Sequence, residues 1–269
     1  MSTCTHNEHP CLASLSLNSR VALVTGAAGG IGSAVAALLA EHGADVALTD
    51  IASSASALEE VAVRIRALGR RSFVQVADVA RKADVDALVA ATKAGLGVVD
   101  VLVNVAGIHR YPTRLIEVAE SDWNRMLAIN LTGPLFVSQA VLPDMVTRNT
   151  GCIVNIASDS AFDVIAGEGP YGISKIGLVR LSAYLAKELA GTAVRVNSIA
   201  PGWVKTGMSK AFWSDPSIAS EAIAGIPARR FAEPVDIANA VLFMVSDGAS
   251  YVNGHCLVVD GGRIAGNPA

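Results

Sequence analysis

The sequence is poor in charge, in cysteine and in long apolar runs. Only 17% of its 269 residues are charged, and the formal net charge is −3 at pH 7. A protein with few charged residues and a slightly negative net charge is not attracted to nucleic acid or anionic lipid by its overall charge. The apolar residues occur in short runs separated by Gly, Asp and Asn, well below the roughly 18 residues that a membrane-spanning helix needs. We therefore expect neither a nucleic-acid partner nor a membrane partner.

Cysteine is scarce, with four in the chain and none in Cys-x-x-Cys spacing. Cys4 and Cys11 lie near the start, whereas Cys152 and Cys256 fall inside apolar, strand-like runs. This pattern favours small buried thiols over disulfides, and hence a reduced, intracellular and cytoplasmic protein. The five histidines show no spacing typical of a metal site, so we expect no metal.

What the sequence does contain is a regular alternation of short apolar runs and helical periodicity. This alternation predicts an α/β fold, a single doubly wound, Rossmann-type parallel sheet of about seven strands with helices on both faces. We expect a loose N-terminal tail over 1–19 and one domain over 20–269. The expected strands are Val21–Thr25, Asp45–Thr49, Ser72–Val76, Val99–Asn104, Cys152–Ala157, Val194–Ile199 and Cys256–Val259. The expected helices are Ile31–Glu41, Ala55–Leu68, Lys82–Leu96, Ser121–Thr147, Tyr171–Ala190 and Val235–Ser246.

The segment between Pro201 and Pro234 breaks this alternation. It is long, loop-like and rich in large apolar side chains. Long loops in compact domains often cover binding sites, so we expect a substrate loop over residues 203–233. The alternative is an ordinary surface helix with aromatic packing. The side chains concerned are Trp203, Met208, Phe212 and Trp213.

The first expected strand runs into a glycine-rich turn, and a helix follows. Gly26, Gly30 and Gly32 let the turn tighten and let the backbone approach a pyrophosphate. The helix start, which includes Ile31, offers free N–H groups and a partial positive charge. The spacing is Gly-x3-Gly-x-Gly rather than the commoner Gly-x-Gly-x-x-Gly. We expect a nucleotide here; the alternative is that the turn serves only helix–strand packing.

The second expected strand ends in an acidic residue, Asp50. A carboxylate at this position can accept hydrogen bonds from the adenosine ribose and would repel a 2′-phosphate. Two like charges about 4 Å apart repel by roughly 4 kcal/mol at an effective dielectric near 20. No Arg or Lys occurs between Thr25 and Arg64 to compensate. The sequence therefore predicts NAD rather than NADP; the alternative is that Asp50 caps the next helix.

Polar and small residues follow the third and fourth expected strands. Asp78 and Val79 come after the third, and Asn104 begins an Asn-Val-Ala-Gly motif after the fourth. The carboxyl ends of these strands line the ligand crevice of a doubly wound sheet. Ala106 and Gly107 are small enough to let a cofactor lie against the backbone. We expect all five residues to contact it.

Tyr171 and Lys175 stand four residues apart in a helical pattern, so they share one helix face. A free tyrosine has a pKa near 10, and lowering it to about 7 requires roughly 4 kcal/mol of phenolate stabilisation. The Lys175 ammonium and a positively charged nicotinamide are plausible sources of that stabilisation. The pair is therefore a candidate general acid/base for carbonyl and alcohol chemistry.

In order and spacing, these motifs resemble the short-chain dehydrogenase/reductase family, over nearly the whole chain from Arg20 to Gly262. Val105 departs slightly from the family pattern, at a tolerant position. The motifs are Thr25-Gly26-x3-Gly30-Ile31-Gly32, Asn104-Val-Ala-Gly107, Asn130, Ser158, Tyr171-x3-Lys175 and Pro201-Gly202.

The resemblance implies a role for each motif residue. Tyr171 is the general acid/base, and Lys175 lowers its pKa and holds the nicotinamide ribose. Ser158 hydrogen-bonds the substrate oxygen, and Asn130 anchors a water that links Lys175 to solvent. The segment that begins with Pro201 and Gly202 passes the nicotinamide, and its Val204 and Thr206 meet the carboxamide.

We therefore expect an NAD(H)-dependent oxidoreductase that interconverts a secondary alcohol and a ketone, and the resemblance implies a homotetramer. The apolar loop favours a small cyclic or apolar alcohol. Sugar or polyol oxidation and reduction of a 3-oxoacyl thioester remain open, because His109, Arg110, Asp159 and Ser160 could bind a sugar or an acid. A non-catalytic NAD-sensing regulator is the alternative from another class.

Overall fold

Seven parallel strands form one sheet in the computed structural model, which describes residues 15–109 and 114–265. The strand order is β3-β2-β1-β4-β5-β6-β7, and every neighbouring pair is parallel. The chain therefore builds outward from β1 to β3 and then returns to the other side of β1. The predicted doubly wound sheet is confirmed. The strands are β1 Val21–Thr25, β2 Asp45–Thr49, β3 Ser72–Val74, β4 Val101–Asn104, β5 Gly151–Ile156, β6 Val194–Pro201 and β7 Cys256–Val259.

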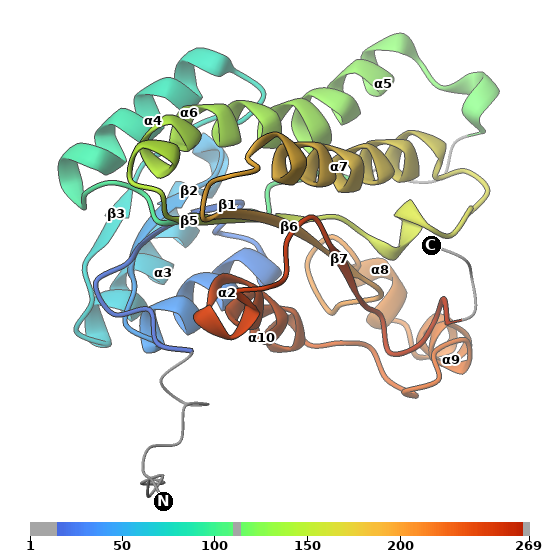
Figure 1. Cartoon of the computed structure of the whole chain (residues 1–269). Helices are drawn as coiled ribbons and strands as arrows, with labels where there is room; N and C mark the ends of the chain where they lie inside the picture. The colour runs from blue at the N-terminus through green and yellow to red at the C-terminus, as the bar shows by residue number, and fades with distance from the viewer. Residues whose placement is uncertain (1–14, 110–113, 266–269) are drawn as a thin grey trace, which may run out of the picture.

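Helices cover both faces of the sheet (Figure 1). Helices α2, α3 and α10 lie on one face, and α4, α5, α6 and α7 lie on the other. Each face has its own apolar core, with Leu39 and Val241 in the first and Leu88 and Val137 in the second. The helices are α2 Gly30–Glu41, α3 Ala55–Ala67, α4 Lys82–Gly95, α5 Glu120–Leu127, α6 Gly133–Thr147, α7 Gly169–Glu188, α8 Lys210–Trp213, α9 Pro216–Ala224 and α10 Pro234–Val245.

Burial on both faces explains the apolar strand sequences. All residues of β1, β2 and β4 are buried, so these strands read as continuous apolar runs instead of alternating ones. The edge strands β3 and β7 are only half-buried. Polar side chains are left for the strand ends, where the ligand crevice opens.

The helix expected over Ser121–Thr147 is interrupted. It begins one residue earlier, and a π-helical segment, Ala128–Thr132, separates α5 from α6. By length and composition the combined helix Glu120–Thr147 could cross a membrane, but 44% of its most apolar window is buried inside the protein. Its apolar character is accounted for by packing against the sheet and α4, as in a core helix.

Leu17 is packed into the domain, although the sequence placed it in the tail. Leu17 is buried, and its N–H donates to the carbonyl of His42 at 2.7 Å. This contact joins the chain to the end of α2 before β1 begins. Residues 1–14 of the expected tail lie outside the described residues.

Candidate active site

Two adjoining cavities open at the carboxyl ends of the central strands. We call them the glycine groove and the tyrosine pocket. They share the residues Ile31, Val105, Gly107, Thr206 and Met208, so a molecule in one reaches the other. The glycine groove is further lined by Gly26, Gly30, Gly32, Asp50, Asp78, Val79, Ala106 and Arg125, among others. The tyrosine pocket is further lined by His109, Ser158, Ser160, Glu168, Tyr171, Lys175, Pro201, Gly202, Val204 and the loop aromatics Trp203 and Phe212, among others.

The glycine turn is shaped for close backbone approach. Gly26 has φ +63°, and a Cβ there would lie 2.7 Å from the backbone nitrogen of Ala106. A Cβ on Gly32 would lie 2.1 Å from the carbonyl oxygen of Gly26. Helix α2 starts at Gly30 with no side-chain cap, so its first N–H groups face the groove without an intrahelical acceptor. This cradle fits a phosphate group.

Asp50 lies at the end of β2 and braces the glycine turn. Its Oδ2 accepts the N–H of Ala28 at 3.1 Å, and its Oδ1 accepts the N–H of Ile51 at 2.8 Å. A carboxylate has about four acceptor sites, so it retains capacity for ribose hydroxyls. The carboxylate lines the groove, which favours a ligand contact over the alternative of a helix cap.

Asn104 does not line either cavity, contrary to the sequence-based expectation. Its side chain is buried between strands, where Nδ2 donates to Asn155 Oδ1 at 2.8 Å. The following loop is fixed by Thr25, whose Oγ1 accepts the N–H groups of Val105 and Ala106, each at 3.1 Å. Asn104 therefore joins β4 to β5, and only the residues after it reach the groove.

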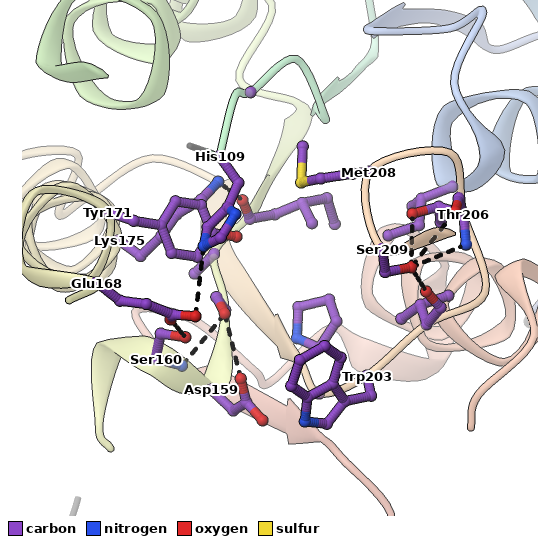
Figure 2. A pocket seen from close by; sticks show the side chains of 18 of the residues that line it. His109, Asp159, Ser160, Glu168, Tyr171, Lys175, Trp203, Thr206, Met208 and Ser209 are labelled. Carbon is purple, nitrogen blue, oxygen red and sulfur yellow. Dashed lines mark hydrogen bonds and ion pairs between the residues drawn. The ribbon is translucent and has the colours of Figure 1, made fainter. Parts of the chain in front are cut away.

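Tyr171 and Lys175 lie on the first turns of α7 and point into the tyrosine pocket (Figure 2). Lys175 is 4% exposed, and its Nζ donates to the carbonyl of Ile156 at 2.9 Å. The same Nζ lies 5.6 Å from the centre of the Tyr171 ring. Ser158, two residues after β5, lines the same pocket. The segment after β5 and the start of α7 thus bring the three groups to one place.

Burial dominates the acid–base properties of this pair. It raises the pKa of Tyr171 to about 12, although the hydrogen bond with Ser158 acts in the opposite direction. It also lowers the pKa of Lys175 to about 8. The predicted lowering of the phenol pKa by Lys175 is therefore not seen in the protein alone, because desolvation is the largest effect on the phenol. The phenol is therefore protonated at neutral pH.

Asn130 lies inside the π-helical segment and is fully buried. Its Oδ1 accepts the N–H of Ile108 at 2.8 Å, and its Nδ2 donates to the carbonyl of Ile108 at 2.9 Å. A Cβ on Gly107 would lie 3.3 Å from Asn130 Oδ1 and 3.4 Å from Lys175 Nζ. Asn130 therefore holds the loop after β4 against Lys175. The water relay stays a prediction.

Two polar groups of the pocket were missed from sequence. Glu168, just before α7, lies with Oε1 3.3 Å from His109 Nε2. Arg263, after β7, donates from Nε to Asp159 Oδ2 at 2.6 Å and from Nη1 to Asp163 at 2.9 Å. Neither Glu168 nor Arg263 belongs to a local motif, because each partner is distant in sequence. Arg110 lies outside the described residues.

The loop after β6 forms the apolar wall of the pocket. Trp203 meets Phe212 edge-on, with ring centres 4.7 Å apart. Trp213, also expected to cover substrate, does not line the pocket; its Nε1 donates to the carbonyl of Thr206 at 2.9 Å and holds α8 in place. Thr206 itself lies over the glycine turn, 3.0 Å from where a Cβ on Gly30 would be.

Known proteins share this architecture. A family model described as enoyl-(acyl carrier protein) reductase matches residues 26–263. D-threitol dehydrogenase of Mycolicibacterium smegmatis is 42% identical, over 91% of this chain and 93% of its own length. Dehydrogenase/reductase SDR family member 4 of Oryctolagus cuniculus is 36% identical, over 91% of this chain and 94% of its own.

Among solved structures, a gluconate 5-dehydrogenase from Burkholderia cenocepacia, in complex with NADP and tartrate, superposes with a TM-score of 0.89. It is 32% identical, and the match covers 95% of this chain and 99% of that one. The seven-stranded parallel sheet agrees with these matches. The chain belongs to the short-chain dehydrogenase/reductase family of oxidoreductases.

Proposed function

We propose that the protein is an NAD(H)-dependent oxidoreductase that interconverts a secondary alcohol and a ketone. The observation that carries this proposal is that Ser158, Tyr171 and Lys175 line one pocket that opens onto the glycine groove. Such a pocket holds a carbinol beside a cofactor ring that accepts or donates a hydride. A regulator without catalysis would not need this acid–base pair.

The residues of the pocket divide the work of the oxidation. Ser158 Oγ holds the carbinol oxygen, and Tyr171 Oη removes its proton. The nicotinamide cofactor supplies the hydride acceptor for the carbinol C–H. Lys175 holds the ribose and lies beside the phenol, and Thr206 and Val204 position the carboxamide. Reduction runs the same steps in reverse, with Tyr171 as the proton donor.

Asp50 supports NAD over NADP. Its carboxylate lines the groove at the end of β2, where it has free acceptor capacity for two ribose hydroxyls. Among the described residues that line the groove, Arg125 on α5 is the one cation. The structure of the similar gluconate 5-dehydrogenase contains NADP, so similarity does not supply a preference for NAD. The proposed preference of this chain for NAD rests on the Asp50 carboxylate alone.

The names of similar proteins suggest several substrates. D-Threitol and gluconate are polyhydroxylated, whereas the family description points to acyl carriers. A small cyclic or apolar alcohol is supported by the Trp203 and Phe212 wall. D-Threitol, gluconate and a small cyclic alcohol each carry a secondary hydroxyl, so a secondary alcohol is their common chemical class, whereas an enoyl thioester would react at its C=C bond.

We also propose a homotetramer in which the α5–α6 and α7 helices pack across an interface. Apolar side chains on the outer surfaces of these helices support it, including Ile173, which is 41% exposed, and Val146, which is 40% exposed. Light scattering after gel filtration tests the proposal, and a monomer at micromolar concentration would contradict it.

Tyr171→Phe tests the catalytic role. We expect turnover of secondary alcohols with NAD⁺ to fall by about 10³-fold, because the proton acceptor is lost. Binding of NADH, followed by its fluorescence, should stay nearly unchanged. Tyr184→Phe is the matched control, since Tyr184 lies on the same helix and is 68% exposed. Full activity in Tyr171→Phe would refute the mechanism.

A further inference from the structure

One wall of the tyrosine pocket is polar, and the mechanism above does not use it. His109, Ser160 and Glu168 line this wall, and Figure 2 shows them beside Tyr171. The side chains of His109 and Glu168 are only 16% and 14% exposed. Glu168 Oε2 accepts the hydroxyl of Ser160 at 3.1 Å. The three side chains form one connected group, which we call the polar wall.

The polar wall keeps a negative charge and spare acceptors. The hydrogen bond from His109 holds the pKa of Glu168 below its usual value in spite of burial, so the carboxylate is ionised at neutral pH. An ionised carboxylate has about four acceptor sites. Among the described contacts, His109 and Ser160 occupy one on each oxygen. The Glu168 carboxylate therefore has room for an added O–H donor.

The polar wall touches both groups that hold the reacting oxygen. The His109 ring meets the Tyr171 ring edge-on, with centres 4.7 Å apart. The N–H of Ser160 donates to Ser158 Oγ at 3.2 Å. A substrate carbon bonded directly to the carbinol carbon therefore faces the polar wall. In Figure 2, Trp203 and Met208 stand opposite it, so the carbon skeleton has an apolar surface to lie on.

A purely apolar substrate fits this pocket poorly. It would displace water from the Glu168 carboxylate and return no hydrogen bond, and buried polar groups left unpaired are costly. A hydroxyl on the neighbouring carbon would restore the lost bond. Charge-assisted hydrogen bonds of this type are about twice as strong as neutral ones.

We infer that the pocket selects neutral vicinal diols and polyols, with Glu168 and His109 as the specificity-determining residues. This inference rests on the proposed function. The reacting hydroxyl binds Ser158 and Tyr171, and the neighbouring hydroxyl donates to Glu168. The C–H of the reacting carbon leaves as hydride to the nicotinamide, and its O–H proton goes to Tyr171. The product is a hydroxyketone, with the second hydroxyl unchanged.

Hydroxy acids are the contrasting class. Around the pocket, Glu168, Asp159 and Asp163 are acidic; Arg263 pairs with the two aspartates through Nε and Nη1, and Lys175 is a further cation on the lining. A substrate carboxylate on the carbon next to the carbinol would face the Glu168 carboxylate directly. The two negative charges would repel each other. The pocket therefore favours a neutral diol over a hydroxy acid of the same length.

Four small probes test the inference with NAD⁺: butane-2,3-diol, butan-2-ol, 3-methoxybutan-2-ol and lactate. We expect kcat/KM for the diol to exceed that for butan-2-ol by at least about 100-fold, because a site built to bind a hydroxyl can reject an analogue lacking it by up to about 10⁴–10⁵-fold. The methyl ether keeps an acceptor and loses the donor, so it should behave like butan-2-ol. Lactate should be the poorest probe.

Two variants assign the selectivity to the polar wall. Glu168→Gln removes the charge and keeps the shape, and we expect the diol-to-butan-2-ol ratio to fall about 10-fold, mainly through KM for the diol. His109→Phe keeps an aromatic ring beside Tyr171 and should lower the ratio similarly. Val164→Ala is the control from the same segment, with a side chain 97% exposed and outside the pocket.

The outcomes separate this inference from the proposed function. No NADH from any probe, or from a wider panel of secondary alcohols, would contradict the proposed function. Equal use of butan-2-ol and the diol would overturn the inference alone. A diol preference that Glu168→Gln leaves unchanged, with a lowered melting temperature, would show that the His109–Glu168 pair only holds the loop, and would overturn it too.

Discussion

Lys175 shows how the active site and the stability of the fold oppose each other. The ammonium is buried at the end of β5 with one carbonyl acceptor from Ile156, and burial alone moves its pKa from 10.5 to about 8. The direction of this change means that the folded protein disfavours the charged form that catalysis requires. Functional sites commonly store such a cost.

Lys175→Met should therefore stabilise the cofactor-free protein while removing activity. The unfolded chain binds more protons than the folded one between pH 8 and 10.5, so stability rises with pH across that window. At pH 7 we expect the variant to be more stable by about 1–3 kcal/mol, after the loss of the Ile156 hydrogen bond. Urea unfolding at pH 7 and pH 10 measures the difference, which should shrink at the higher pH. A variant less stable at both pH values would contradict the expectation.

Asp50→Asn should relax the cofactor preference. The amide keeps an acceptor for the glycine turn and removes the charge that repels a 2′-phosphate. We expect the ratio of kcat/KM with NADP⁺ to that with NAD⁺ to rise by about 10-fold or more, from part of a repulsion of roughly 4 kcal/mol. Asp247→Asn, a 79% exposed carboxylate after α10, is the control for the same change in net charge. A preference of the unmodified protein for NADP⁺ would refute the role given to Asp50.

Single residues could be predicted where one motif carries them. Tyr171 and Lys175 share a helix turn, and the glycine turn is contiguous, so local spacing was enough to place them. Glu168 meets His109 across 59 positions of sequence, and Arg263 meets Asp159 across 104. Such pairs depend on the three-dimensional arrangement of strands, which periodicity cannot supply.

At the scale of elements, the α5–α6 helix departs most from the sequence-based expectation. The strand positions follow from apolar runs, because each strand is buried on both faces. The π-helical segment Ala128–Thr132 cannot be recognised from the spacing of apolar residues, because it adds only about one residue to a single turn of the helix. Its effect is local: Asn130 faces the loop after β4.

Gly133 controls how closely this helix approaches the glycine groove. A Cβ there would lie 2.9 Å from Val79 Cγ2 and 3.2 Å from its carbonyl oxygen. Gly133→Ala should gain about 1 kcal/mol of helix propensity but lose about 1–3 kcal/mol to overpacking. Because Val79 lines the groove, we expect weaker NADH binding as well as a lower melting temperature.

Gly225→Ala is the matched control for that substitution. Its Cβ would be 3.6 Å from the nearest carbonyl oxygen, an ordinary contact at the end of α9. Fluorescence titration with NADH and thermal unfolding should separate the two variants. If Gly133→Ala binds NADH as tightly as the unmodified protein, then pressure of the added Cβ on Val79 does not alter the groove.

At the scale of the whole molecule, the site is closed by the far end of the chain. Arg263 follows β7, at one edge of the sheet, and pairs with Asp159 and Asp163 after β5, which lies two strands away. Asp159 is adjacent to Ser158 and accepts its hydroxyl at 3.2 Å. The serine of the active site is therefore positioned by a contact that forms only when the last strand is in place.

Arg263→Met should weaken both the fold and the reaction. It leaves Asp159, which is 5% exposed, without its cation, and removing one partner of a largely buried pair costs about 3 kcal/mol. Burial already raises the pKa of Asp159, so without Arg263 the carboxyl takes up a proton more readily. A raised folded-state pKa gives stability that is complete at low pH and is lost as pH rises, so the loss of unfolding free energy in the variant should be larger at pH 7.5 than at pH 5.

Urea unfolding at the two pH values measures this loss of stability. In addition, kcat for a secondary alcohol should fall more than KM rises, because Ser158 loses its orientation. Arg263→Lys keeps the charge and loses the second hydrogen bond. Its stability and kcat should lie between those of the unmodified protein and of Arg263→Met. A deficit independent of pH would show that packing of the Arg263 side chain, and not its charge, holds the catalytic segment.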